Sequence, residues 1–152
     1  MTPNPQPTYK GSCLCKAIQY TITGTPLTTV LCHCTNCKKS SGSSFQANLF
    51  FKKDCLNFQS GQDKLSTYAD AATDSGGIPH RSFCSVCGSN ILSTNDSHDL
   101  VKDLVIITSG CLDGWPTGEG EKEFRPVQEY YCKRKVEWVR VLGETKEFEG
   151  MT

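Results

Sequence analysis

The chain has 152 residues, ten of them cysteine, and its 16 basic and 16 acidic residues give a net charge of zero. This length fits one ordinary domain with a sizeable core. Because nucleic acids and anionic membranes are bound through basic surfaces, the balanced charge argues against both as partners. No apolar run approaches the length of a transmembrane helix, so the sequence predicts no membrane span.

The first nine residues, within "MTPNPQPTYK", contain three prolines and no apolar core. This composition is typical of a flexible arm and not of a secretory signal. Without such a signal, ten cysteines favour an intracellular metal protein over a secreted disulfide scaffold. We therefore expect a cytoplasmic protein with a small-molecule partner.

Short segments rich in β-branched and aromatic residues alternate with turn residues along the chain. The segments that we expect to be strands cover residues 17–23, 45–51, 104–110 and 127–141. In the first of them Ile18, Tyr20 and Ile22 share one face, which is the period of a strand. No segment of ten or more residues has convincing helical periodicity.

These patterns predict one mainly β, antiparallel domain over residues 10–142, with short helical turns after the cysteine motifs. Residues 114–126, "GWPTGEGEKEFRP", read as a polar loop. Residues 143–152, "GETKEFEGMT", are expected to form a solvated tail.

Seven of the cysteines fall into three compact groups. The groups are a C-x-C pair at Cys13 and Cys15, a C-x-C-x-x-C motif at Cys32, Cys34 and Cys37, and a C-x-x-C pair at Cys84 and Cys87. Residues i and i+2 of a strand point to the same face, so both cysteines of a C-x-C pair can face one ion. A C-x-x-C pair closes around a metal through a tight turn, and Gly88 suits the exit of that turn.

Counting thiolates suggests two different zinc sites in one chain. The C-x-C and C-x-x-C pairs together supply four thiolates, which is a closed structural zinc site. The C-x-C-x-x-C motif supplies three, and three protein ligands with an open fourth position are typical of catalytic zinc. The sequence therefore predicts two zinc ions, one structural and one catalytic.

Other assignments remain open at this stage. The three-cysteine motif could borrow a ligand from the C-x-x-C pair, which would leave the C-x-C pair in the core. His33, His80 or Cys111 could also supply a fourth ligand, although His33 should face away from its neighbours in an extended segment. The isolated cysteines Cys55, Cys111 and Cys132 are expected to be small buried apolar residues.

The segments "GSCLCKAIQY", "CHCTNCKKSSGSSF", "FCSVCGSNI" and, more loosely, "ITSGCLDG" follow one another from Gly11 to Gly114. In this order they resemble the glutathione-dependent formaldehyde-activating enzyme family, which is also called the centromere protein V-type zinc domain. The resemblance implies an Mss4-like β fold and the same division into a structural and a catalytic zinc site. It also implies a carbon–sulfur lyase that interconverts S-hydroxymethylglutathione with glutathione and formaldehyde. The chain departs from the family at Glu129, where a histidine is often found.

The charge of a three-thiolate zinc site favours thiol chemistry. Such a site has a net charge near minus one and acidifies bound water weakly, so hydrolysis is disfavoured. A soft incoming thiol, glutathione above all, suits the open position. Cys32, Cys34 and Cys37 are thus the predicted catalytic residues, and His33, His80 and His98 are candidates for moving a proton.

The carboxylates of such a substrate need hydrogen-bond donors near the metal. The predicted substrate-binding residues follow Cys37 directly and are Lys38, Lys39, Ser40, Ser41, Gly42 and Ser43. Arg81, Arg125 and Arg134 are further candidates. The alternative function is a non-catalytic zinc module for protein interaction, because the fold alone does not decide activity.

Overall fold

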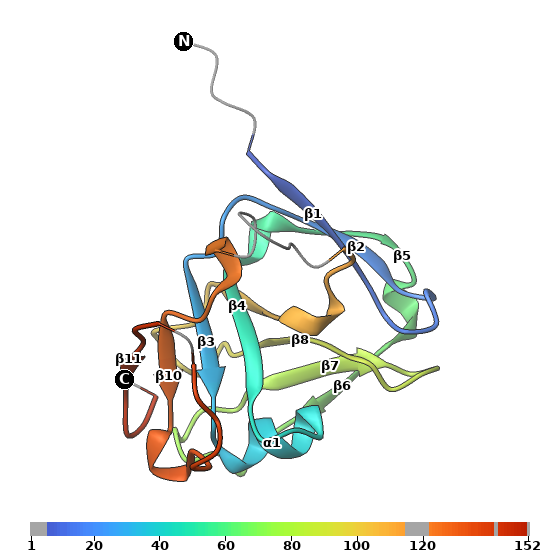
Figure 1. Cartoon of the computed structure of the whole chain (residues 1–152). Helices are drawn as coiled ribbons and strands as arrows, with labels where there is room; N and C mark the ends of the chain where they lie inside the picture. The colour runs from blue at the N-terminus through green and yellow to red at the C-terminus, as the bar shows by residue number, and fades with distance from the viewer. Residues whose placement is uncertain (1–5, 115–121, 142, 152) are drawn as a thin grey trace.

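The structure, a computed structural model, describes residues 6–114, 122–141 and 143–151 (Figure 1). Over these residues it has two sheets, built from eleven strands, and one α-helix, which confirms the predicted mainly β fold. The expectations for residues 1–5 and 115–121 lie outside the described residues. Among the described helices none is long and apolar enough to cross a membrane.

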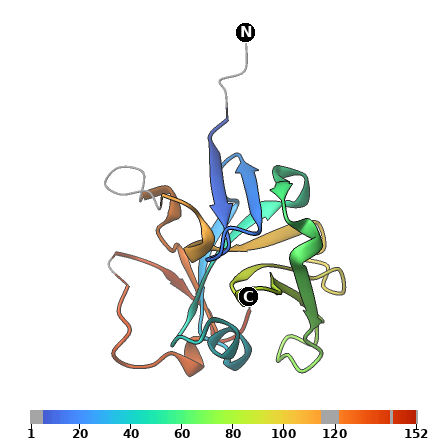
Figure 2. The same ribbon diagram turned by 90° about the vertical axis from the view of Figure 1, so that its right-hand side faces the viewer.

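The smaller sheet has three antiparallel strands and forms one end of the molecule (Figure 1, Figure 2). Its strands, in spatial order, are β1 (Thr8–Ser12), β2 (Gln19–Thr23) and β5 (Leu56–Ser60). Gly11 of β1 lies against the ring of Tyr20, and a Cβ at this position would lie 2.1 Å from a ring carbon. Only glycine therefore lets β1 approach the buried tyrosine closely enough to pair with β2.

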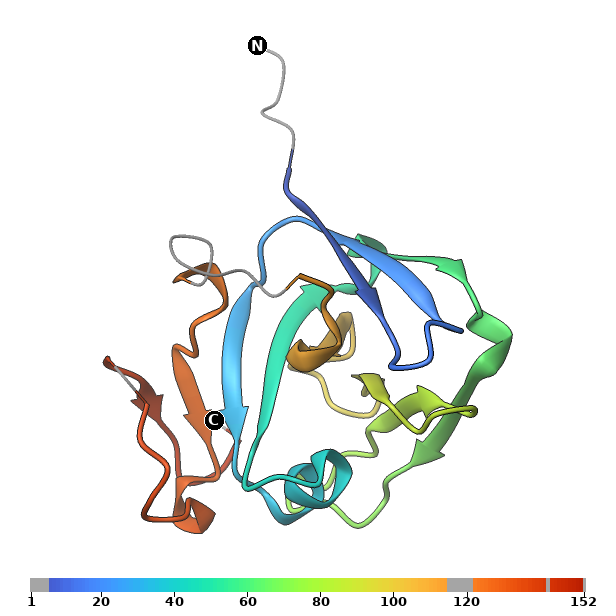
Figure 3. The same ribbon diagram turned by 45° about the vertical axis from the view of Figure 1, so that its right-hand side comes forward.

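The larger sheet has eight strands and curves from the edge at β11 to the edge at β6 (Figure 3). In spatial order these are β11 (Lys146–Glu147), β10 (Gln128–Tyr130), β3 (Thr28–Cys32), β4 (Gln46–Lys52), β9 (Leu104–Thr108), β8 (Asn90–Thr94), β7 (His80–Cys84) and β6 (Leu65–Ala69). Pairing is antiparallel except between β3 and β10 and between β10 and β11. The α-helix of the described residues, α1 (Thr35–Ser41), connects β3 to β4.

Strand β4 separates two hydrophobic cores. Leu49 and Phe51 enter the core between the two sheets, where Ile18 and Ile107 also lie. Phe50, which points to the opposite face, enters the second core. Because both faces of β4 are buried here, Leu49, Phe50 and Phe51 are three consecutive apolar residues rather than an alternating pattern.

Three of the four predicted strands correspond to β2, β4 and β9. The fourth, predicted over residues 127–141, is wrong after residue 130. Tyr131 has a left-handed backbone with φ of 59°, and a 3-10 turn, η5 (Cys132–Arg134), follows it. The left-handed residue redirects the chain, so the apparent alternation beyond it does not continue the sheet.

Segments near both ends of the chain form strands that the sequence does not predict. Strand β1 begins at Thr8, inside the segment expected to be an arm. The expected solvated tail pairs with β10 through β11, and the Phe148 ring packs edge-on against Tyr130 at 5.6 Å. Burial of this aromatic ring and of the neighbouring Met151 gives the polar-looking tail an apolar anchor.

Candidate functional site

The first cysteine group joins the small sheet to the large one. Cys13 and Cys15 follow β1, whereas Cys84 and Cys87 lie at the end of β7, and the four sulfurs are all within 4.8 Å of one another. The Cys13 and Cys15 sulfurs are 3.5 Å apart, and those of Cys15 and Cys84 are 3.9 Å apart. A zinc tetrahedron with bonds near 2.3 Å has sulfur–sulfur distances of about 3.8 Å, so this group fits a tetrahedral metal.

Local backbone groups prepare these sulfurs to be thiolates. The Ile18 N–H donates to the Cys13 sulfur at 3.2 Å, and the Val86 N–H donates to the Cys84 sulfur at 3.4 Å. The Ser89 hydroxyl and nearby backbone N–H groups lower the pKa of Cys87 to about 5. Gly88, with φ of 76°, closes the turn with a hydrogen bond from its N–H to the Cys84 carbonyl.

The second cysteine group lies at the junction of β3 and α1. Cys32 ends the strand, Cys34 is the N-cap of the helix and Cys37 lies in its first turn. The Cys37 N–H donates to the Cys34 sulfur at 3.2 Å, which is the usual bond of a helix cap with sulfur in place of oxygen. All three sulfurs lie within 4.8 Å of one another.

The three thiols of this group share their protons. Hydrogen bonds from Cys32 and Cys37 lower the pKa of Cys34 to about 2, and bonds to the other two thiols raise the pKa of Cys32. One thiolate therefore forms easily while its neighbours stay protonated to stabilise it. A divalent cation displaces such protons when it binds thiolates, so the chemistry of this donor set fits a metal ion.

Both groups could hold a metal ion, and the second lines a cavity. The four-cysteine group adjoins the core between the sheets, with Cys13 and Cys84 almost fully buried. The three-cysteine group lines a cavity of about 100 Å³ together with Tyr130 and Tyr131. An incoming molecule can therefore reach the second group from the cavity side.

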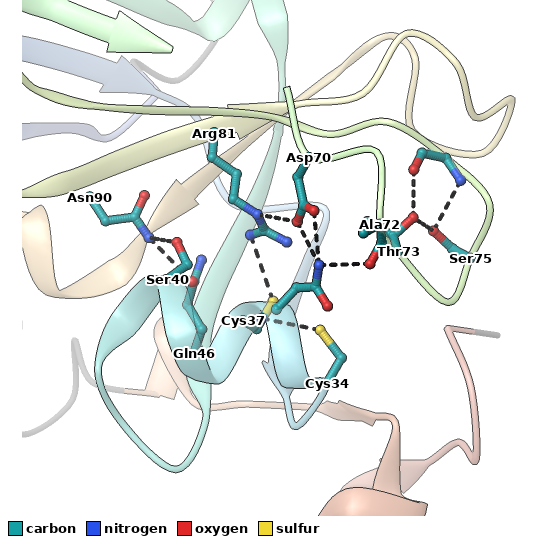
Figure 4. Close-up of polar contacts among 12 residues, drawn as sticks. Cys34, Cys37, Ser40, Gln46, Asp70, Ala72, Thr73, Ser75, Arg81 and Asn90 are labelled. Carbon is teal, nitrogen blue, oxygen red and sulfur yellow. Dashed lines mark hydrogen bonds and ion pairs between the residues drawn. The ribbon is translucent and has the colours of Figure 1, made fainter. Parts of the chain in front are cut away.

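Arg81 of β7 supplies positive charge beside the second group (Figure 4). Its Nη1 lies 4.0 Å from the Cys37 sulfur, and its Nε donates to Asp70 Oδ2 at 2.9 Å. Asp70 is buried, and Asn36 Nδ2 lies 2.9 Å from each of its two carboxylate oxygens and donates to them. Asp70 thus fixes Arg81 from one side and α1 from the other, so the guanidinium is held near the sulfurs.

The other proposed ligands of the second group lie elsewhere. His33 is fully buried, and its Nε2 is 2.8 Å from Glu129 Oε2, outside the cysteine group. His80 is an exposed residue of β7. The Cys111 thiol donates to the Asn90 carbonyl at 3.2 Å. Within the described residues, none of these three side chains joins Cys32, Cys34 and Cys37 in a group of potential metal ligands.

A third group of potential ligands, Glu129, Cys132 and Glu147, already contains a cation from the protein. The Lys135 ammonium donates to Glu129 Oε1 and to Glu147 Oε1, both at 2.9 Å. The lysine pairs with both carboxylates, so this group is an ion-pair network rather than a metal site.

The predicted substrate-binding run divides into two parts. Lys38 donates to the Arg134 carbonyl, Ser41 donates to the Phe45 carbonyl, and Gly42 is the left-handed C-cap of α1 with Ser43 following it. These residues support the end of the helix. Lys39 and Ser40 instead line a separate cleft on the outer side of α1.

No sequence motif indicates several residues that line the cavity or, in the case of Asp70, contact a residue that lines it. Arg81 was one of three arginine candidates, whereas Asp70, Asn36 and Tyr131 were not singled out. They come from β7, from the segment after β6, from α1 and from the end of β10. Only the tertiary fold brings them together, so no local motif could have identified them.

Comparisons with known proteins agree with this architecture. The family model described as "Glutathione-dependent formaldehyde-activating enzyme" matches residues 8–134. A crystal structure of a Rhodobacter sphaeroides protein is similar in fold, with a TM-score of 0.55 and 17% sequence identity over 71% of this chain and 91% of that one. No curated protein matches the chain.

Proposed function

This chain belongs to the glutathione-dependent formaldehyde-activating enzyme family, and we propose that it is a zinc-dependent carbon–sulfur lyase acting on thiol–aldehyde adducts. Its substrate is S-hydroxymethylglutathione, which it interconverts with glutathione and formaldehyde. The observation that carries the proposal is the contrast between the two cysteine groups. Cys13, Cys84 and Cys87 of the first group pack against a core and Cys15 is exposed, whereas the group of three opens on a cavity beside an arginine.

The proposed metal assignment follows the donor sets. Cys13, Cys15, Cys84 and Cys87 would hold a structural zinc, and Cys32, Cys34 and Cys37 would hold a catalytic zinc. When bound by three thiolates, zinc would supply a coordination position that favours a substrate sulfur in its thiolate form.

The reaction breaks one carbon–sulfur bond and needs no redox partner. In the lysis direction the bond's electron pair goes to sulfur, the hydroxymethyl oxygen becomes the carbonyl oxygen of formaldehyde, and the hydroxyl proton ends on the thiol. The residues of the cavity must therefore stabilise negative charge on sulfur and bind an oxygen that gains or loses a proton.

Two side chains of the cavity suit these tasks. The Arg81 guanidinium, held by Asp70, places positive charge beside the cysteine sulfurs. Burial above all, and then the nearby Cys34 thiolate, raises the pKa of Tyr131, so its hydroxyl stays protonated at neutral pH. The Tyr131 O–H would donate a hydrogen bond to the substrate oxygen in the cavity.

The same proposal requires a reducing compartment, and we infer that the protein is cytoplasmic. All ten cysteines are free thiols in the structure. Thiolate ligands bind zinc only while they remain reduced, which the cytoplasm provides.

The test replaces a ligand of the open group and leaves the closed group intact. We expect Cys34→Ser to bind one zinc fewer than the wild type and to abolish exchange between formaldehyde and glutathione, measured by NMR, because the site loses a thiolate. Cys55→Ser is the matched control, since Cys55 is half-buried and outside both cysteine groups.

Two outcomes would contradict the proposal. Full exchange by Cys34→Ser would show that the open group is not the site of the reaction. A wild-type protein with two bound zinc ions and no exchange would favour the non-catalytic zinc module.

A further inference from the structure

The cavity at the three-cysteine group is too small for a tripeptide. Its volume is about 100 Å³, whereas sites for whole small molecules occupy about 300–1,000 Å³. Only the reacting thiol and aldehyde atoms fit there. A larger substrate must therefore extend into a neighbouring space.

A cleft of about 710 Å³ lies beside the cavity. Arg81 and Asn36 line both spaces, so cleft and cavity adjoin at these two residues, and we call this shared boundary the neck. Figure 4 shows Arg81 reaching from its strand toward Cys37, with Asp70 beside it. Since Asp70 bonds to both neck residues, the position of the neck is fixed by a buried carboxylate.

The floor of the cleft is one face of the large sheet near the β6 edge. In the register of β6 and β7, Tyr68 pairs with Arg81, and Phe83 lies two residues further along β7. Residues two apart on a strand, and residues paired across strands, share a face. Two aromatic rings therefore flank the route to Arg81, and Tyr68 is 61% exposed with nothing packed over it in the described residues.

The wall of the cleft is the outer face of α1. Asn36, Lys39 and Ser40 are three and four residues apart, which places them on one side of the helix. Ser40 accepts a hydrogen bond from Asn90 of β8 at 3.0 Å, and this contact joins the wall to the floor. The side chains that line the cleft thus belong to regular elements and have fixed positions.

The residues that line the cleft have a net charge of +1. Lys39 and Arg81 are cationic, Asp70 is anionic, and the other lining residues are neutral. Arg81 is already paired with Asp70, whereas Lys39 is exposed and makes no ion pair within the described part of the chain. At neutral pH a glutathione adduct carries two carboxylates and one ammonium, a net charge of about minus one. The cleft and the adduct are therefore complementary in charge.

We propose that this cleft binds the peptide part of the thiol substrate, with Lys39 pairing a terminal carboxylate and Tyr68 covering the peptide chain. Arg81 and Asn36 at the neck direct the thiol end toward Cys32, Cys34 and Cys37. This inference rests on the proposed function and adds to it the residues that select an anionic peptide thiol over a small neutral one.

Binding can be tested without turnover by using S-methylglutathione, which keeps the peptide and its charges but has no free thiol. Titrated into the zinc-loaded protein, it should shift the amide resonances of residues 35–40, 68 and 81–83. Lys39→Glu should weaken its affinity about tenfold, because attraction becomes repulsion. Lys52→Glu is the matched control, since Lys52 is an exposed lysine at the opposite end of β4 from α1.

Kinetics supply the second test. The hydroxymethyl adducts of glutathione and of 2-mercaptoethanol share the reacting atoms, but only the first has a peptide. We expect Lys39→Glu to lower the ratio of kcat/KM for the glutathione adduct to that for the small adduct about tenfold. Tyr68→Ala should lower the same ratio a few-fold, through lost contact area.

The outcomes separate this inference from the proposed function. If Lys39→Glu and Lys52→Glu have equal affinity and equal ratios, the cleft is not the peptide site and the inference is overturned. If S-methylglutathione shifts the cleft residues but the wild type turns over neither adduct, the cleft assignment stands and the lyase proposal fails.

Discussion

Tyr131 has a backbone conformation that tyrosine rarely adopts. Its φ is 59°, and non-glycine residues in this region are uncommon because Cβ crowds the backbone. Two hydrogen bonds hold it there: its N–H donates to the Gly150 carbonyl at 2.8 Å, and its carbonyl accepts from the Arg134 N–H at 2.9 Å. Such strain persists only where the surroundings fix it, and it often marks a functional site. Here it fixes the residue whose ring lines the three-cysteine cavity.

We expect Tyr131→Phe to lower kcat for the glutathione adduct about 100-fold with little change in KM, because the substrate oxygen loses a donor. Tyr130→Phe is the natural comparison, since Tyr130 lines the same cavity but its hydroxyl donates to Gln128 at 2.8 Å. Steady-state kinetics of both variants check this. Equal losses in the two variants would mean that the Tyr131 hydroxyl has no special part in the reaction.

At the scale of residues, the sequence was most informative where chemistry depends on local spacing. The C-x-C and C-x-x-C pairs indicated a four-thiolate group, and the structure brings those sulfurs together. Arg81 and Asp70 could not be ranked in the same way. Asp70 meets Asn36 across 34 residues of chain, and no pattern in one sequence reports such a contact.

Among the elements, the edge formed by β10 and β11 depends on one buried carboxylate. Glu129 of β10 is 1% exposed, and its Oε1 accepts hydrogen bonds from Lys135 at 2.9 Å and Thr145 at 2.6 Å. Its Oε2 lies 2.8 Å from His33 Nε2. Glu129 therefore links β3, the turn after β10 and the segment before β11, so it helps to dock the tail.

We expect Glu129→Gln to destabilise the fold by about 3 kcal/mol, because breaking a buried ion pair leaves Lys135 without its main partner. Glu147→Gln, at the exposed end of the same network, should cost far less. Urea unfolding of the two variants measures the difference. Equal effects would mean that Glu129 is not the anchor of this edge.

The same variant has an expected pH dependence. Burial opposes ionisation of Glu129, but hydrogen bonds from Lys135, Thr145 and His33 outweigh it and lower the pKa below the usual 4.5. A carboxylate with a lowered pKa stabilises the fold fully above about pH 4.5, and this contribution is lost as the pH falls through the folded-state pKa. The stability gap between wild type and Glu129→Gln should therefore narrow below pH 4.5.

Element prediction failed where tertiary packing overrides a local pattern. The alternation in "KRKVEWVRV" suggested a strand, yet Trp138 is 73% exposed and the segment follows a 3-10 turn. The polar tail is expected to be solvated, and residues 143, 144, 146, 147 and 149 are exposed, but Phe148 packs on Tyr130. The sequence predicts a short helical turn after the cysteine motif, and α1 lies there. Its full length is not predicted, because seven residues are too few to show helical periodicity.

Across the whole molecule, the two cysteine groups have different structural roles. The four-cysteine group connects β1 of the small sheet to β7 of the large sheet, about 70 residues later in the chain. The three-cysteine group connects residues that are already neighbours, from Cys32 to Cys37. A cross-link stabilises more when the loop that it closes is longer, because it removes more conformational freedom from the unfolded chain.

Metal removal should therefore affect the two groups differently. We expect Cys15→Ser to lower the Tm of the zinc-loaded protein by at least about 10 °C, because zinc binding at a structural site is part of the folding free energy. Cys34→Ser should lower it by only a few degrees. Cys15 is exposed, so its substitution removes a metal ligand without opening a cavity in the core. In a chelator titration followed by circular dichroism, the protein should stay folded after it loses the first zinc ion. Loss of the second zinc ion should unfold it. Equal Tm values for the two variants would mean that the four-cysteine group does not hold the sheets together.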